Sequence, residues 1–118
     1  MALTVYQYPK CSTCRKALKW LDEHEVRYDS VNIAEKPPAR STLAAALKHT
    51  GLPLRALFNT SGESYRNGGF KERLPSLSQA EALSALAQDG KLIKRPLLID
   101  GERVLVGFDE KRWSEALL

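Results

Sequence analysis

The chain opens with short apolar segments, in which the spacing of the apolar residues is typical first of a strand and then of a helix. Residues 3–8 are rich in β-forming side chains and end at Pro9, which predicts a strand that leaves a sheet. Apolar side chains then recur at helical spacing, at Cys14, Leu18 and Leu21. This spacing predicts a helix with one apolar face that ends near His24. A second strand is expected over residues 28–33.

The middle of the chain combines helix signals with chain breakers. Pro37-Pro38 interrupts the chain, and Ser41 is then expected to cap a helix that stops at Gly51. Pro53 predicts that a short helix begins directly behind it. Several short helices are therefore expected here instead of one long helix.

Further helix signals follow a polar loop over residues 59–62. Residues 70–74 are expected to form one helical turn. A capping box between Ser78 and Glu81 then predicts a longer helix that ends at Gly90.

The last third of the chain changes character. Two apolar runs, 97–99 and 104–106, flank Asp100-Gly101, which predicts a β-hairpin. Asp109 is expected to cap a final short helix that carries Trp113.

The order of these elements predicts a single α/β domain over residues 1–118, with a helical insertion near residues 36–90. The length of 118 residues fits one domain, and 43% apolar with 27% charged residues is ordinary for a globular protein. No apolar run approaches the roughly 18 residues that a spanning helix needs, so no membrane segment is expected. The first residues, from Met1 on, lack the pattern of a signal peptide, and a cytoplasmic location is therefore expected.

The net charge of +4 is only mildly basic. It allows an acidic partner or a small anion to bind. The densest basic cluster is explained by a solvated helix face and consists of Lys10, Arg15, Lys16 and Lys19. Because no basic helix carries interleaved aromatic residues, direct contact with nucleic acid is not expected.

Cys11 and Cys14 form a C-x-x-C motif, which serves either dithiol chemistry or one half of a zinc site. A zinc site needs four ligands, and the chain has neither a second such motif nor histidines at finger spacing, so we expect no metal and no cofactor. The two cysteines could also be inert core residues, since Cys14 lies on the apolar helix face. In a reducing compartment, cysteine pairs are more often catalytic than structural, which favours redox chemistry.

The two cysteines occupy different predicted environments. Cys11 lies where the first strand ends and the helix begins, and unpaired N–H groups and the helix dipole favour a thiolate there. Lys10 and Arg15 are expected to add positive charge. Cys14 lies one turn further along and is expected to be more buried and less acidic. Cys11 is therefore the expected attacking thiol, and Cys14 the thiol that resolves the product as an internal disulfide.

Several segments together resemble one known family. They are residues 8–17 around the cysteines, residues 57–62, residues 93–97 with the Arg95-Pro96 pair, and Gly107-Phe108 after the hairpin. In combination they are similar to the arsenate reductase-like (ArsC) family of the thioredoxin-like superfamily, in the branch that includes the Spx/MgsR regulators. The similarity extends over essentially the whole chain.

The resemblance implies a thioredoxin-like four-stranded mixed sheet, with the helical insertion between strands two and three. It also implies that Cys11 is the nucleophile, facing a cis-proline at Pro96, and that Arg95 holds an anion or a thiolate. A guanidinium suits that role because it stays charged and presents a planar fork. The expected binding residues beside the cysteines are Lys10, Ser12 and Thr13. A further group provides either hydrogen-bond donors to the site or a capped turn that holds the insertion: Asn59, Thr60 and Ser61.

The chain departs from the pattern of the arsenate reductases in this family, which surround the oxyanion with three arginines. Arg95 matches one of them, but Asn59 and Gly107 occupy the other two positions. Losing two cations is expected to weaken oxyanion binding, with Arg66 as a candidate replacement. The second cysteine, Cys14, points to an internal dithiol in place of a glutathione-dependent cycle.

Two functions remain open at this point. The first is a reductase that acts on a disulfide, a glutathione adduct or an oxyanion, with glutathione, glutaredoxin or thioredoxin as reductant. The second is an Spx-like transcriptional regulator that binds the C-terminal domain of the RNA polymerase α subunit and is switched by a Cys11–Cys14 disulfide. A monomer is expected in either case.

Overall fold

A four-stranded mixed sheet lies at the centre of the computed structural model, which describes residues 3–118. Met1 and Ala2, on which the expectation about a signal peptide partly rests, lie outside the described residues. The strand order is β2-β1-β3-β4. β1 pairs parallel with β2 and antiparallel with β3, and β3 pairs antiparallel with β4. The strands are β1 (Thr4–Gln7), β2 (Asp29–Asn32), β3 (Leu97–Asp100) and β4 (Arg103–Val106). The predicted mixed sheet and hairpin are therefore confirmed.

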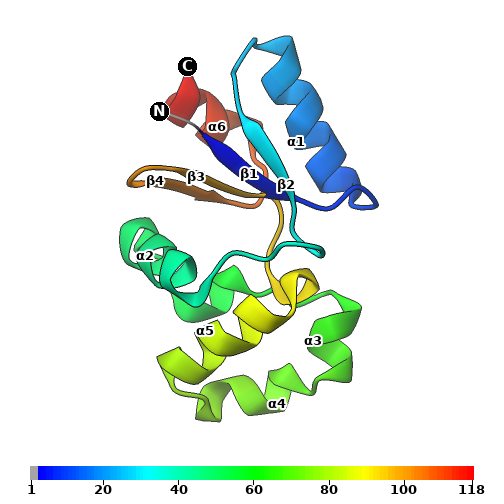
Figure 1. Cartoon of the computed structure of the whole chain (residues 1–118), viewed down its shortest axis with the longest axis vertical. Coiled ribbons are helices and arrows are strands. Elements are labelled where there is room, and N and C mark those ends of the chain that lie inside the picture. Colours follow the sequence, from blue (N-terminus) through cyan, green and yellow to red (C-terminus); the bar gives the residue numbers. More distant parts are fainter. Residues whose placement is uncertain (1–2) are drawn as a thin grey trace.

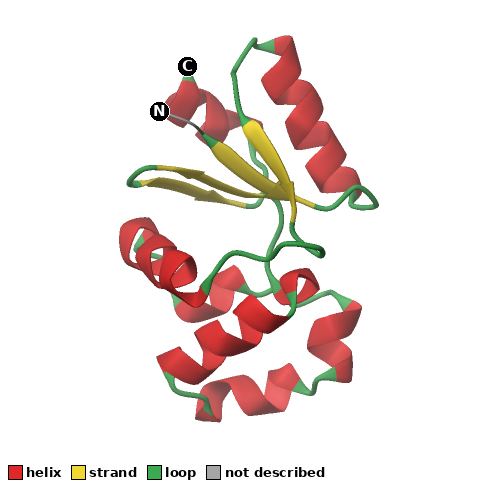
Figure 2. Ribbon diagram, in the orientation of Figure 1, coloured by secondary structure: helices red, strands yellow, loops and turns green. Residues whose placement is uncertain are grey.

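Two layers of helices flank the sheet, as Figures 1 and 2 show. One layer, called the α1–α6 layer below, contains α1 (Ser12–Glu23) and α6 (Glu110–Leu117). The other is the helical insertion, which lies between β2 and β3 along the chain, as the resemblance implied. Its elements are α2 (Arg40–Thr50), η1 (Leu54–Leu57), α3 (Glu63–Asn67), α4 (Phe70–Arg73), η2 (Leu74–Ser76), α5 (Gln79–Gln88) and η3 (Gly90–Leu92). Within residues 3–118, no helix is long and apolar enough to cross a membrane.

The structure corrects three details of the insertion. Helix α2 begins at Arg40 with Ala39 as its N-cap, so the expectation that Ser41 caps it is wrong. The chain stays extended through Ala39 and turns helical one residue later, so Ser41 already lies in the first turn. Helix α5 ends at Gln88 instead of Gly90. Helix α3 was not predicted, because its five residues are too few to show a helical apolar period.

Each face of the sheet covers its own apolar core. On the α1–α6 side, the indoles of Trp20 and Trp113 meet edge to face, with ring centroids 6.1 Å apart. On the insertion side, Leu43, Leu86 and Leu97 are fully buried.

A close backbone contact joins the insertion to the sheet near the end of β2. Gly90, the first residue of η3, lies against the backbone of Ile33, where an added Cβ would overlap the Ile33 carbonyl oxygen. Only glycine fits this contact. The contact therefore fixes η3, and with it the start of the segment that leads into β3.

Candidate active site

Cys11 is the N-cap residue of α1, at the point where the chain turns from β1 into the helix. Its backbone N–H donates to the Tyr8 carbonyl at 2.9 Å, which closes the turn. Its backbone is extended, and its sulfur accepts the Cys14 N–H at 3.4 Å. The sulfur therefore lies among the unpaired N–H groups at the positive end of the helix, as the sequence predicted.

The surroundings of the two thiols shift their pKa values in opposite directions. Partial burial raises the pKa of Cys11, but hydrogen bonds from the Cys14 side chain and backbone, with the nearby Arg95, outweigh it and lower that pKa overall. Complete burial, followed by the hydrogen bond to Cys11, raises the pKa of Cys14 to about 12. Both thiols are unpaired in this structure. The arrangement therefore favours a thiolate at Cys11 and a neutral thiol at Cys14.

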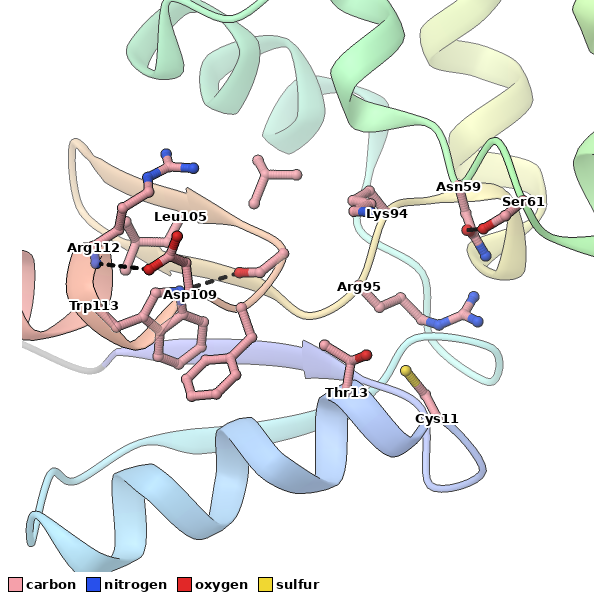
Figure 3. A pocket seen from close by; sticks show the side chains of 13 residues that line it. Cys11, Thr13, Asn59, Ser61, Lys94, Arg95, Leu105, Asp109, Arg112 and Trp113 are labelled. Atoms are coloured by element: carbon pink, nitrogen blue, oxygen red, sulfur yellow. Dashed lines mark hydrogen bonds between the residues drawn. The ribbon is translucent and has the colours of Figure 1, made fainter.

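Arg95 faces Cys11 from the segment between η3 and β3. Its Nη1 donates to the Lys91 carbonyl at 3.0 Å, and its guanidinium lies over the Tyr8 ring, 5.3 Å from the centroid. Its Nε is buried, with no hydrogen-bond partner within residues 3–118. Figure 3 shows the guanidinium beside the Cys11 sulfur. An unsatisfied buried donor of fixed positive charge is suited to bind an incoming anion or thiolate.

A cleft of about 380 Å³ opens in front of Cys11. It contains five of the residues expected at the site: Cys11, Thr13, Asn59, Ser61 and Arg95. Other expected residues lie elsewhere in the described part of the chain. Lys10, Ser12 and Thr60 are exposed beside the cleft, while Cys14 and Pro96 are buried behind it. The Arg95–Pro96 peptide bond is cis, as the resemblance implied.

The loop at residues 59–62 has the turn that one of the two interpretations expected. It forms a turn, in which the Gly62 N–H donates to the Asn59 carbonyl at 3.1 Å and the Asn59 N–H binds the Leu92 carbonyl at 2.8 Å. Asn59 and Ser61 nevertheless line the cleft. Arg66 donates to the Ser61 carbonyl at 2.8 Å and is exposed. It therefore supports this loop and lies outside the described lining of the cleft.

The cleft also contains residues that sequence reasoning did not assign to the site. They come from the segment between η3 and β3, and from β4 through the beginning of α6: Lys94, Leu105, Val106, Gly107, Phe108, Asp109, Arg112 and Trp113. The Gly107-Phe108 pair was part of the resemblance, and Asp109 was recognised only as a helix cap. Their position beside the cysteines depends on the pairing of β3 with β1, which no local pattern shows. Among the described residues, no group of three or more histidine, cysteine, aspartate or glutamate side chains is placed to hold a metal ion.

The sequence matches one family model and several known proteins, two of which are described as regulators. The ArsC family model matches residues 6–116. The protein YusI of Bacillus subtilis (strain 168), described as uncharacterized, is 52% identical over 98% of each chain. The regulatory protein MgsR of the same organism is 27% identical over 91% of this chain and 83% of its own. The global transcriptional regulator Spx of Streptococcus mutans is 28% identical over 92% of this chain and 77% of its own.

Solved structures agree with this assignment. An ArsC family related protein from Bacteroides fragilis is 40% identical, with a TM-score of 0.93 over 98% of this chain and 97% of that one. A protein from Streptococcus mutans UA159, described as a possible arsenate reductase, is 45% identical, with a TM-score of 0.88 over 95% of this chain and 97% of that one. Because the family model matches nearly the whole chain and these relatives share its fold throughout, the chain belongs to the ArsC family.

Proposed function

We propose that this protein is a thiol-redox protein in which Cys11 attacks and Cys14 resolves. The observation that carries the proposal is the contrast between the two sulfurs. Cys11 caps α1 and accepts the Cys14 N–H, which lowers its pKa, while Cys14 is buried with its pKa raised to about 12. A dithiol works in this way when one thiol is ionised and reachable and its neighbour stays protonated until it is needed.

The reaction that fits this geometry is thiol–disulfide exchange. The Cys11 thiolate attacks one sulfur of a substrate disulfide, the substrate S–S bond breaks, and one thiol leaves with a proton from solvent. Cys14 then loses its proton and attacks Cys11. The second substrate thiol leaves, and a Cys11–Cys14 disulfide forms. Two electrons pass from the dithiol to the substrate, and an external thiol reductant (glutathione, glutaredoxin or thioredoxin) regenerates the dithiol.

Arg95 has two roles in this proposal. Its positive charge supports the Cys11 thiolate before attack, and the same charge favours the departure of the substrate thiolate. Asn59 and Ser61 supply polar groups at the same end of the cleft. Asn59 and Gly107 provide no charge to an oxyanion, so a disulfide or a thiol adduct is a better substrate for this site than arsenate. Such a cycle operates in a reducing compartment, which is consistent with the expected cytoplasmic location.

The experiment that tests this function is reaction of the reduced protein with 2-hydroxyethyl disulfide, followed by mass spectrometry. The wild-type protein is expected to form the internal Cys11–Cys14 disulfide. Cys14→Ser is expected to stop at a mixed disulfide on Cys11, because the resolving thiol is missing. Cys11→Ser is expected to remain unmodified at neutral pH. Equal reactivity of Cys11→Ser and the wild type would refute the proposal.

A redox-switched regulator is a second candidate, favoured by the similarity to MgsR and Spx over more than nine-tenths of this chain. Its partner would be the C-terminal domain of the RNA polymerase α subunit, without direct contact to nucleic acid. Binding of that domain to the protein with the Cys11–Cys14 pair reduced or oxidised tests this candidate. No binding in either state would remove it.

The reduction potential of the Cys11–Cys14 pair separates the two candidates. A potential well above the cytosolic poise of roughly −220 to −320 mV keeps the pair reduced at rest, as a sensor requires. A potential below that range suits a reductant. Oxidation of the Cys14→Ser variant at the same potential would show that the measured value does not belong to the pair.

A further inference from the structure

The cleft continues well beyond the thiol. At one end, called the thiol end, lie Cys11, Thr13, Asn59, Ser61 and Arg95. At the other, called the distal end, lie Leu105, Asp109, Arg112 and Trp113. Figure 3 shows Lys94 between the two ends. The distal end comes from β4 and the beginning of α6, and thiol–disulfide exchange at Cys11 makes no use of it.

The size of the cleft argues for a ligand larger than a single oxyanion. A water molecule accounts for about 30 Å³ of liquid volume, so an anion with four oxygens fills only a fraction of the 380 Å³. Clefts that bind small organic molecules have volumes of about 300–1,000 Å³. The volume therefore suits a molecule the size of a short peptide, which would reach from Cys11 towards the distal end.

The charges along the cleft favour a negative group on the ligand. Lys94, Arg95 and Arg112 contribute three positive charges against the single carboxylate of Asp109. Asp109 Oδ1 already accepts the backbone N–H groups of Lys111 and Arg112, at 3.0 and 3.3 Å, as the cap of α6. Within residues 3–118 the only ion pair joins Arg103 to Asp100, outside the cleft. The cations of the cleft are therefore not neutralised by the protein itself.

Gly107 keeps the passage between the two ends open. It is buried and has a φ of +75°, and its N–H donates to the Pro96 carbonyl at 2.9 Å. An added Cβ would lie 3.4 Å from Lys94 Cε, so a larger side chain here would point toward Lys94. The Gly107 carbonyl in turn accepts the Trp113 indole N–H at 3.1 Å. The glycine thus leaves space beside Lys94 while its backbone stays fixed.

We propose that the cleft contains a carboxylate subsite beyond the thiol end, at which Lys94 and Arg112 recognise the acidic end of a short, thiol-containing peptide disulfide. This inference rests on the proposed thiol-redox function and names the class of substrate. The sulfur of the peptide is placed at Cys11, and its carboxylate lies between Lys94 and Arg112 in the same cleft. The exchange is the one described above, with two electrons passing from the Cys11–Cys14 dithiol to the peptide disulfide and an external thiol reductant restoring the dithiol.

A series of matched disulfides tests the subsite. Each probe is N-acetylcysteine followed by zero to three glycines, joined to a neutral, chromophoric thiopyridine, with either a carboxylate or a carboxamide at the C-terminus. The release of thiopyridone by the reduced protein gives the rate of attack by Cys11. Because each residue spans about 3.3–3.6 Å, the series moves the charge stepwise along the cleft.

In the wild type, the ratio of the carboxylate rate to the carboxamide rate is expected to reach about tenfold at one intermediate or longer length. That factor is typical of one charge-assisted hydrogen bond. Arg112→Gln is expected to lower the ratio severalfold at that length. Lys111→Gln is the matched control, because Lys111 is an exposed neighbour on the same helix that lies outside the cleft lining. It is expected to keep the wild-type ratio.

The possible outcomes separate this inference from the proposed function. A ratio that is the same at every length, or that Arg112→Gln leaves unchanged, would overturn the carboxylate subsite while the attack by Cys11 stands. A preference found only without glycines would assign the carboxylate to Arg95 and would also overturn it. If no probe reacts with Cys11, the proposed function and the subsite both fail.

Discussion

The two layers that flank the sheet differ in how they are built. The α1–α6 layer consists of two continuous helices, each capped by a side chain at its first turn, from Cys11 and Asp109. Its core sets two tryptophans, Trp20 and Trp113, among aliphatic side chains, and Phe108 meets Trp113 edge to face with ring centroids 4.9 Å apart. The insertion is a chain of short α and 3₁₀ helices, and its core combines mainly leucine and isoleucine with a cluster of three rings, Phe58, Tyr65 and Phe70.

The two layers supply different parts of the candidate site. The α1–α6 layer supplies the nucleophile, because the N-terminus of α1 holds the Cys11 sulfur. The insertion and the segment that leaves it supply the facing wall, through Asn59, Ser61 and Arg95. Changes in the insertion are therefore expected to affect stability or the wall, while changes in α1 act directly on the thiol. The following predictions test this division, from the largest effect to the smallest.

Gly90→Ala is expected to have the largest effect, because it forces the insertion away from the backbone at the end of β2. The new Cβ would overlap the Ile33 carbonyl oxygen, and backbone cannot move aside as a flexible side chain does. We expect a loss of more than about 3 kcal/mol in the free energy of unfolding, measured by urea denaturation. Gly51→Ala is the control, because Gly51 has a φ of +67° with open space around it. It is expected to cost only about 1–2 kcal/mol. Equal losses in the two variants would contradict the steric explanation.

The buried thiol of Cys14 is expected to make the reduced protein less stable at alkaline pH. Its pKa is raised from the ordinary 9.0 to about 12, so above pH 9 the unfolded chain binds fewer protons than the folded one. The free energy of unfolding therefore falls as pH rises from 9 towards 12, by about 1.4 kcal/mol per pH unit. The lowered pKa of Cys11 makes the free energy of unfolding rise with pH, but only below pH 9.

Cys14→Ala isolates this contribution from the other groups that titrate at high pH. The variant lacks the thiol, so its free energy of unfolding is expected to fall less steeply between pH 9 and pH 11 than that of the wild type. Parallel curves in reducing buffer would show that burial does not keep Cys14 protonated.

Arg95→Gln tests the contribution of the facing wall to the thiol. Removing the guanidinium is expected to move the pKa of Cys11 upward, because Arg95 helps to lower it. The midpoint of the pH profile for alkylation by iodoacetamide should rise, and alkylation at neutral pH should be severalfold slower. Arg66→Gln, a change at an exposed arginine that binds the Ser61 carbonyl, should leave the midpoint unchanged. An unaltered midpoint in Arg95→Gln would place the origin of the acidity in α1 alone.

Ser78→Ala is the mildest change and acts only within the insertion. The Ser78 hydroxyl accepts a hydrogen bond from the Glu81 N–H at 3.1 Å, and the Glu81 carboxylate accepts one from the Ser78 N–H at 2.9 Å. Losing this capping box is expected to cost about 1 kcal/mol in the free energy of unfolding. The alkylation profile of Cys11 should stay the same. A changed profile would show that the layers are coupled more tightly than their construction indicates.

Local signals were sufficient to predict the parts of the fold that local interactions control. The C-x-x-C helix, the Asp100-Gly101 hairpin and the Ser78 capping box were predicted correctly, because each rests on neighbouring residues. The start of α2 was wrong, because the preceding prolines hold the chain extended and leave Ala39 as the cap, without a side-chain hydrogen bond.

The candidate site was predicted only in part, for a physical reason. Cys11 and Arg95 were linked through the family resemblance, since no sequence pattern joins residues so far apart. Arg112 and Asp109 were missed as site residues because they meet the cleft only after β4 and α6 fold back beside β3. Asp109 gave a helix-cap signal, which describes its backbone contacts and says nothing about the cleft.

The placement of the tryptophans has a consequence for spectroscopy. The chain has two, Trp20 and Trp113, and both are buried in the α1–α6 layer. Tryptophan fluorescence therefore reports on that layer alone, whereas far-ultraviolet circular dichroism also records the many short helices of the insertion. If both methods give one melting curve, the molecule unfolds as a single cooperative unit. If the circular dichroism signal is lost at a lower temperature than the fluorescence signal, the insertion can open while the thiol stays on an intact helix.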